Sequence, residues 1–358
     1  MQLYGIEELY CPPSGVEVDI VAVHGINGDA RRTWTSVASN VCWLNHTDLL
    51  PKYIKNARVL VWGYNANVTS SKGRSTSADR ILQHAQTLVA QLQADRELEG
   101  AKERPIIFLC HSLGGIIVKR ALAYSASRTS AKIVHLHSIY TCTYGILFFG
   151  TPHSGSSQAR LFSNLQKMVS LTIPKKALQT DSSLLQALEE DSEVLQNITD
   201  QFAPLQYRFR IFFFWEQERT DLKYTKDYIV DETSAAPILD DTERSGIAAD
   251  HRDMCRFNRK ESPGFRTVIA ALQRYCIEAP GIVRVRVGET KADLEAHRRS
   301  ESQHLLGGIS ENTLPPRLGN SDLPPGGRAL SHPFDSFGEK GWLRQEVAED
   351  GSGWQITT

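Results

Sequence analysis

The stretch Cys110-His111-Ser112-Leu113-Gly114-Gly115 decides the fold of this chain, and it lies between an apolar run at 106–109 and a helix-like run at 116–122. Strand, sharp turn and helix in this order form the setting of the G-x-S-x-G nucleophile elbow, in which a serine projects above a parallel sheet. The turn brings two backbones close together, so the residues two positions before and after the serine must be small. Gly114 meets this requirement, whereas Cys110 departs from glycine but has a small side chain. A glycine-rich helix start with an unrelated serine is the alternative, and the rest of the chain decides between the two.

An oxyanion loop is predicted upstream of this elbow. The β-branched run 17–23 ends in His24-Gly25, and Ile26 follows directly after the glycine. The backbone N–H groups of Ile26 and Leu113 are the two donors expected to face a developing oxyanion. His24 itself is expected to be a structural hydrogen-bonding residue and not a catalytic base.

A catalytic acid and a histidine should follow the serine, in the chain order serine, acid, histidine. The run 207–215 is predicted to be a buried strand, and Glu216 lies at its end. His251 follows a loop and precedes a helix-like segment, as a general base should. Asp231 and Asp250 are rival acids, but Asp250 directly precedes His251, and a direct neighbour rarely reaches the far ring nitrogen. Glu216 is therefore the predicted acid and Asp231 the reserve.

Six ordered motifs carry a resemblance to a known family, and they are His24–Gly28, Arg32–Trp34, Ala57–Val59 with Gly63-Tyr64, His111–Gly115, Phe149–Ser156 and Asp250–Cys255. Over roughly residues 1–278 the chain resembles the lipase-like serine esterase family of the serine-active-site-containing protein. That family is related to the glycosylphosphatidylinositol (GPI) inositol-deacylases and also forms the N-terminal hydrolase domain of fungal NLR-like receptors. The resemblance implies an α/β-hydrolase fold with Ser112 as nucleophile and His251 as base. It also implies Glu216 as the acid, because the family places its acid after the strand that precedes the 230–235 segment.

Length and composition fit one domain of this kind. The chain has 358 residues, 41% of them hydrophobic, and an α/β-hydrolase core takes one domain of roughly 200–250 residues. The formal net charge of −1 gives no electrostatic reason to expect nucleic acid or an anionic membrane as a partner. The six cysteines are widely spaced without a C-x-x-C pair, so reduced thiols are expected.

Localisation is predicted from two sources that differ. The first residues show no signal-peptide pattern, and no apolar run reaches the ~18 residues of a membrane span, so the sequence predicts a cytoplasmic protein. The family resemblance suggests association with a mitochondrial or endoplasmic reticulum membrane. A peripheral membrane contact through an apolar face is compatible with both. The sequence does not indicate an oligomeric state.

The chain is predicted to form an α/β-hydrolase domain over residues 1–279 and a largely disordered tail over 280–358. Alternating strands and helices favour a doubly wound, mostly parallel sheet. A helical cap insertion is expected at about 156–206, and its apolar stripe is expected to face both the core and the acyl substrate. Within the tail, the alternating segment 281–288 predicts one short strand. Strands are predicted near 5–10, 17–24, 58–63, 105–110, 144–149, 207–215 and 228–231, and helices at 76–96, 113–126, 263–276 and within 156–202.

No cofactor and no metal ion are required by a serine, histidine and glutamate triad. His135 and His137 would share one face of a strand, but no third ligand stands at a matching spacing, so packed or solvated histidines are expected. His153 follows a predicted strand end, where contact with substrate and structural bonding of its loop both remain open.

Two classes of function fit these features. The first is a serine hydrolase, esterase-like or lipase-like, that cleaves a carboxylic ester of a lipid or other apolar acyl donor, with a small-molecule or lipid ester as its partner. The second is a non-catalytic or weakly catalytic hydrolase-fold signalling module, as the receptor relatives suggest. A complete set of serine, histidine and acid favours the first, because a binding module does not need all three. A role in lipid handling at membrane contacts is implied by the resemblance alone.

Overall fold

The computed structural model describes residues 3–66, 77–153, 158–171, 195–222 and 225–310. The chain divides into one compact unit that ends at Gln303 and a second that begins at His304. The first unit contains a seven-stranded sheet with the strand order β1-β3-β2-β4-β5-β6-β9. Its strands are β1 (Gly5–Tyr10), β2 (Val18–Val23), β3 (Ala57–Gly63), β4 (Ile106–His111), β5 (Thr143–Phe149), β6 (Arg210–Glu216) and β9 (Thr242–Ile247).

The sheet is parallel except for β1, which runs antiparallel to β3. The strand that follows β2 in the chain, β3, pairs with one edge of β2, and the next strand, β4, pairs with the other edge of β2. Such a reversal creates a topological switch point, and ligands of open α/β sheets bind there, beyond the carboxyl ends of the strands. This doubly wound topology is the α/β-hydrolase fold predicted from the sequence.

The central strands form because most of their residues are apolar, with Asp19 in β2 and Arg58 in β3 as charged exceptions near the strand starts. All residues of β2, β3 and β5 are buried, as expected for parallel strands covered on both faces. Side chains alternate between the two faces of a strand, and β5 shows this directly. A Cβ on Gly145 would meet Tyr275 of α9 (Phe265–Ser310), whereas Phe148 contacts the side of α3 (Leu113–Ala126). The two helices therefore cover opposite faces of the sheet.

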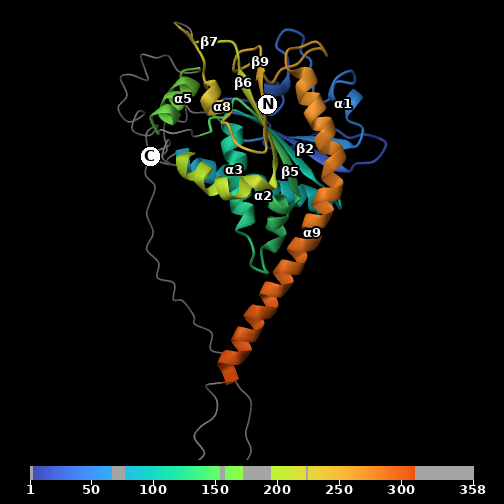
Figure 1. The fold of residues 1–358 in the computed structure, drawn as a ribbon. Coiled ribbons are helices and arrows are strands. Elements are labelled where there is room, and N and C mark those ends of the chain that lie inside the picture. Colours follow the sequence, from blue (N-terminus) through green and yellow to red (C-terminus); the bar gives the residue numbers. More distant parts are fainter. Residues whose placement is uncertain (1–2, 67–76, 154–157, 172–194, 223–224, 311–358) are drawn as a thin grey trace, which may run out of the picture. The chain divides into compact units, whose positions relative to one another are not determined.

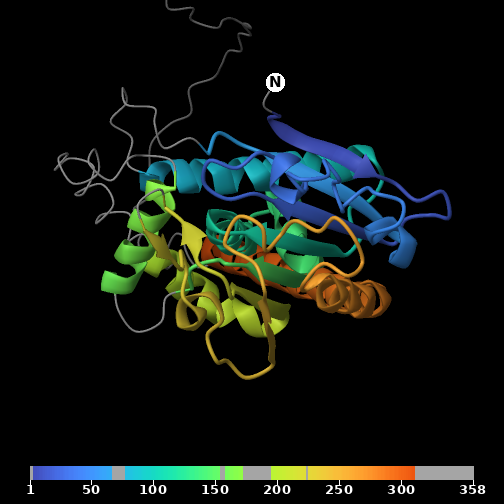
Figure 2. The same ribbon diagram turned by 90° about the horizontal axis from the view of Figure 1, so that it is seen from above.

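Figure 1 shows this arrangement, and the view from above in Figure 2 shows the strands between the two helical layers. The helix α2 (Ser77–Leu98) packs beside α3. The remaining helices are α1 (Leu50–Tyr53), α4 (Ser138–Cys142), α5 (Gln158–Ser170), α8 (Glu232–Ala235) and a helical stretch at 195–202, with short 3-10 turns at Arg32–Trp34, Val134–His137 and Ala203–Arg208. A two-stranded ribbon joins β7 (Thr220–Asp221) to β8 (Lys226–Asp227).

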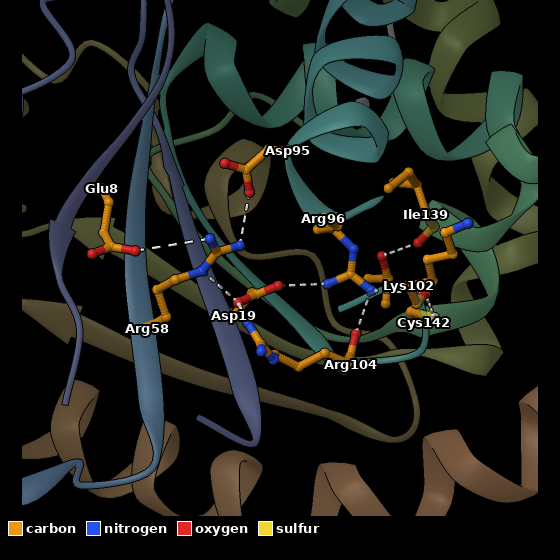
Figure 3. Close-up of polar contacts among 10 residues, drawn as sticks. Glu8, Asp19, Arg58, Asp95, Arg96, Lys102, Arg104, Ile139 and Cys142 are labelled. Carbon is orange, nitrogen blue, oxygen red and sulfur yellow. Dashed lines mark hydrogen bonds and ion pairs between the residues drawn. The ribbon is translucent and has the colours of Figure 1, made fainter. Parts of the chain in front are cut away.

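A buried charge network holds the amino-terminal edge of the sheet together. The carboxylate of Asp19 in β2 is fully buried and accepts hydrogen bonds from Arg58 Nε at 3.0 Å, Arg96 Nη1 at 2.6 Å and Arg104 Nη1 at 3.0 Å (Figure 3). Arg58 also donates to Asp95 at 2.7 Å. The network thus joins β2, β3, α2 and the segment before β4 at the edge opposite to the switch point.

The last strand of the sheet differs from the prediction. Residues 228–231 are not a strand, and β9 at Thr242–Ile247 occupies the sheet edge beside β6. The sequence of β9, Thr-Glu-Arg-Ser-Gly-Ile, is mostly polar because an edge strand pairs on one side only and its residues are mostly half-buried. The apolar pair Ile229 and Val230 is instead buried in a turn that leads into α8.

The predicted strand at 281–288 is also wrong, because this segment continues the helix α9. Its valines alternate in sequence, but burial follows helical spacing, with Val283 and Val287 buried and Val285 60% exposed. The first compact unit accordingly reaches Gln303, beyond the predicted domain end at residue 279. Residues 311–358 lie outside the described residues, so disorder there stays a prediction.

A proline inside α9 explains why the sequence pattern ended too early. Pro280 has no N–H to bond the carbonyl of Cys276 one turn earlier, and such a loss usually breaks a helix. In this fold Asn56 Nδ2 donates to that carbonyl at 3.4 Å. A side chain from the segment before β3 thus satisfies the carbonyl that Pro280 leaves free.

Candidate active site

Ser112 occupies a strained turn between β4 and α3. Its backbone has φ 54° and ψ −126°, a conformation that costs free energy in a residue with a side chain and is typical of functional sites. The turn is possible because its neighbours are glycines: a Cβ on Gly114 would lie 2.5 Å from the carbonyl oxygen of His24, and one on Gly25 would lie 2.6 Å from Ser112 Cβ. The elbow predicted from the sequence is present with this geometry.

Glu216 and His251 meet at the same edge of the sheet. Glu216 ends β6, His251 follows β9, and both are 2% exposed. Glu216 Oε1 lies 3.4 Å from His251 Nδ1 and accepts a hydrogen bond from the Val230 N–H at 2.6 Å. Glu216 Oε2 accepts a hydrogen bond from Thr220 Oγ1 at 3.3 Å. The carboxylate is thus fixed on both oxygens and faces the imidazole.

The rival acids have other contacts. The Asp231 side chain caps α8 by accepting from the Ser234 N–H at 3.1 Å, and it also bonds the hydroxyl groups of Thr233 and Ser234. Asp250 accepts from the backbone N–H groups of Arg252 and Asp253 at 3.0 and 2.9 Å. Both carboxylates therefore stabilise local turns.

The predicted oxyanion donors flank Ser112. Ile26 follows β2 and Leu113 is the first residue of α3, so the switch point brings both close to Ser112. Within the part of the chain that the structure describes, neither backbone N–H donates to another protein group. Unpaired N–H groups at a helix start are suited to bind negative charge.

Ser112 and His251 line one pocket of about 140 Å³, together with Ile26, Asn27, Gly28, Thr33, His111, Leu171, Arg252 and Arg256. No direct bond joins the serine to the histidine, and the two ring nitrogens of His251 have no hydrogen-bond partner among the described residues. Ser112 Oγ instead lies 3.6 Å from the sulfur of Met168. Ser112 is accordingly only 1% exposed.

Met168 belongs to α5, one of the two described parts of the predicted cap, and nothing in the sequence indicated that it would contact the serine. It is buried in a small apolar cluster, apart from the main core, whose members are Met168, Leu222, Ile229, Val230 and Ala235. Lys167 Nζ donates to the Tyr228 carbonyl at 3.0 Å and pairs with Asp227 at 2.9 Å, which fastens α5 to this cluster. Residues 172–194 of the predicted cap lie outside the described residues.

The other histidines named from the sequence have structural contacts. The His24 ring stacks on Tyr64 with a centroid distance of 4.3 Å, and burial lowers the pKa of His24 to about 4, so it is a neutral structural residue as predicted. The ring of His153 lies 4.6 Å from both Phe148 and Phe213, and its backbone N–H bonds the Ser234 carbonyl at 2.7 Å.

The remaining two histidines named from the sequence, His135 and His137, do not form a metal site with other described residues. His135 and His137 lie in a 3-10 turn and not on a strand. Over the described ranges, no group of three or more histidine, cysteine or acidic side chains could hold a metal ion.

The fold and the site define a hydrolase of the α/β class with a serine at its nucleophile elbow. A sequence profile of the family described as "Putative serine esterase (DUF676)" matches residues 19–198, half of the chain, and the chain belongs to this family. The family resemblance predicted from the six motifs is thereby confirmed. The description of this family names a serine esterase and leaves the substrate open.

The similar curated proteins are named "Protein SERAC1". The bovine protein is 24% identical over 205 residues, which make up 53% of this chain and 30% of the relative. The zebrafish (Danio rerio) protein is 27% identical over 192 residues, or 49% of this chain and 28% of the relative. The chain thus matches less than a third of the length of these relatives.

Similar solved structures include the Bacillus licheniformis lipase BlEst2 in mature form, with a TM-score of 0.46 and 16% identity over 75% of this chain and 97% of the lipase. MenH from S. aureus has a TM-score of 0.39 and 12% identity over 77% of this chain and 99% of its own. Among the described helices, none is long and apolar enough to cross a membrane. Association with a mitochondrial or endoplasmic reticulum membrane stays a prediction.

Proposed function

We propose that this chain is a serine hydrolase that cleaves carboxylic esters with an apolar acyl group, using Ser112, His251 and Glu216. The observation that carries the proposal is the joint position of these residues. A strained elbow serine and a buried histidine line one pocket, and a buried glutamate lies 3.4 Å from the histidine Nδ1. A structural turn without catalytic use has no need of this backbone strain.

The reaction follows from the roles of the three side chains. Ser112 Oγ attacks the ester carbonyl carbon while His251 Nε2 takes the hydroxyl proton, and Glu216 stabilises the imidazolium that forms. The N–H groups of Ile26 and Leu113 hold the oxyanion. When the carbon–oxygen bond to the alcohol breaks, His251 returns its proton to the leaving alkoxide. Water then attacks the acyl-enzyme in the same manner, which releases the acid and restores the serine.

The apolar cluster around Met168 supports an apolar acyl group. Met168 of this cluster lies 3.6 Å from Ser112 Oγ, and Ile26 and Leu171, which pack against the cluster, line the pocket of Ser112. A pocket lined by apolar side chains with a few converging polar groups is the usual form of a small-molecule site. In this structure Met168 occupies the approach to the serine, so substrate binding requires its side chain to move.

One observation favours a second candidate, a hydrolase-fold signalling module with little or no catalysis. Ser112 is 1% exposed and its hydroxyl contacts a methionine sulfur instead of His251. A module that uses the fold for protein contacts could keep its serine covered in this way.

Hydrolysis of a series of p-nitrophenyl esters of increasing acyl length separates the two candidates. The proposed hydrolase turns over these esters, and Ser112→Ala reduces kcat by about a thousandfold or more while the circular dichroism spectrum and melting temperature stay close to those of the wild type. Ser127→Ala, which changes an exposed serine at the end of α3, serves as the matched control with full activity. Equal hydrolysis by wild type and Ser112→Ala would remove the proposal, and no hydrolysis of any ester would favour the signalling module.

A further inference from the structure

Thr220 connects the proposed acid and the proposed base through one hydroxyl group. It is fully buried at the start of β7, four positions after Glu216. Its Oγ1 accepts a hydrogen bond from the His251 backbone N–H at 3.0 Å, and it donates to Glu216 Oε2 at 3.3 Å. Since an amide N–H can only donate and a carboxylate only accept, the direction of both bonds is fixed.

His111 holds the other polar backbone group of the same histidine. Its Nε2 donates to the His251 carbonyl at 2.8 Å, and the two rings lie 5.0 Å apart. Burial, with the nearby His251 as a second cause, lowers the pKa of His111 to about 3, so His111 is neutral and its single ring proton must be on Nε2. Because His111 directly precedes Ser112, this bond links the elbow to the histidine loop.

These backbone bonds matter because, within the described part of the chain, the ring nitrogens of His251 make no hydrogen bonds that would hold the imidazole in place. Neither ring nitrogen has a hydrogen-bond partner among the described residues, and the 3.4 Å from Nδ1 to Glu216 exceeds the range of a strong hydrogen bond. The position of the ring therefore depends on where the backbone of residue 251 is held.

We propose that Thr220 and His111 are positioning residues, which hold the backbone of His251 so that its imidazole lies between Glu216 and Ser112. This inference rests on the proposed function, because it assigns His251 as the base. The proposal requires a hydroxyl group at position 220, because this group accepts from the His251 N–H and donates to the Glu216 carboxylate at the same time. Serine can do both, and valine can do neither.

The test compares Thr220→Val, which keeps the shape but removes the hydroxyl, with Thr220→Ser, which keeps the hydroxyl. Thr143→Val is the matched control, because Thr143 is equally buried and its hydroxyl bonds the Ile139 carbonyl at 2.6 Å, away from the pocket. Thr220→Val should lower kcat by about tenfold to a hundredfold, since small displacements of a catalytic group have effects of this order, with KM changed by less than about threefold. Thr220→Ser should restore most of the rate, and Thr143→Val should keep the wild-type kcat even if it is less stable.

The pH profile of kcat/KM is a second readout. A displaced Glu216 stabilises the imidazolium less, so the acidic limb of this profile should differ between Thr220→Val and wild type. A wild-type kcat and an unchanged profile in Thr220→Val would overturn the inference while leaving the proposed hydrolase intact. An equal loss in Thr220→Val and Thr220→Ser would also overturn it, because the hydroxyl would then not be the cause.

Two further controls keep the result decisive. If Thr220→Val does not fold, Thr220→Ala replaces it in the same comparison, and His111→Phe tests the second bond with the same expected fall in kcat. A wild-type protein that neither hydrolyses esters nor reacts with a fluorophosphonate at Ser112 would show that the proposed function, on which the inference rests, has failed.

Discussion

Replacing Glu216 with glutamine should nearly abolish catalysis without unfolding the protein. The glutamine side chain would keep the shape of the glutamate, and its amide oxygen could still accept from the Val230 N–H that Glu216 Oε1 now binds at 2.6 Å. What the change removes is the negative charge that faces His251. The affected quantity is therefore the stability of the imidazolium during the reaction, and not the binding of substrate.

The size of the effect follows from the geometry. At the 3.4 Å between Glu216 Oε1 and His251 Nδ1, an effective dielectric constant of about 20 gives about 5 kcal/mol of attraction between carboxylate and imidazolium. Since ~1.36 kcal/mol corresponds to a tenfold change in rate, kcat should fall by about a thousandfold to ten-thousandfold. The upper value equals the loss of about ten-thousandfold in the serine-protease precedent.

The assay compares Glu216→Gln with Asp231→Asn and Asp250→Asn under saturating ester, with melting temperatures measured for all three. Asp231 caps α8, and asparagine is an equally good cap, so Asp231→Asn should keep its rate within about threefold and lose little stability. A crippled Asp231→Asn beside a Glu216→Gln of nearly wild-type rate would refute the assignment of the acid.

Three predictions concern stability and are measured by urea unfolding. Asp19→Asn should reduce the free energy of unfolding by about 3–5 kcal/mol, because it removes the buried carboxylate that three guanidinium groups share, two of them buried; a loss below about 1 kcal/mol would contradict this role. Burial lowers the pKa of His24 to about 4 and that of His111 to about 3, so the unfolded chain binds more protons below about pH 6.5. Stability should then fall as the pH drops from about 6.5 to 4, by up to ~1.4 kcal/mol per pH unit for each histidine, and a flat profile would refute the burial of neutral rings. Removal of residues 280–358 should cost roughly 3–5 kcal/mol through the two buried valines of α9, whereas removal of 304–358 should cost much less, and equal costs would contradict the role of α9.

The sequence predicted the centre of the fold well because its signals are local. The strands β2, β4 and β5 contain apolar runs, at 20–23, 106–109 and 146–149, and the turn at Ser112 needs glycine neighbours that can be read directly. The sheet edge was missed, since the polar β9 lacks such a run and the apolar pair Ile229 and Val230 imitates one. The predicted helix ended before Pro280, whereas α9 continues through it. The contact of Asn56 with the Cys276 carbonyl joins distant parts of the chain and cannot be read from a local pattern.

In the candidate site, too, residues with a local sequence signal could be predicted, and contacts between distant residues could not. Chain order and the family motifs indicated Ser112, Glu216 and His251, which lie at or beyond the carboxyl ends of three different strands of one sheet. The contact between Met168 and Ser112 could not be predicted, because an apolar helix stripe does not reveal which of its residues faces the nucleophile. The Thr220 hydroxyl was also missed, since an isolated threonine carries no sequence signal and its role depends on tertiary contacts.

Covalent labelling with a fluorophosphonate, followed by mapping of the adduct by mass spectrometry, tests the central claim most directly. An activated elbow serine should react at neutral pH, with one adduct per chain located on Ser112, and Ser112→Ala should remain unlabelled. Labelling of Glu216→Gln should be much slower than that of the wild type, since Glu216 supports His251, the proposed base that activates Ser112. A folded wild-type protein that stays unlabelled, or an adduct on another residue, would contradict the assignment of Ser112 as the nucleophile.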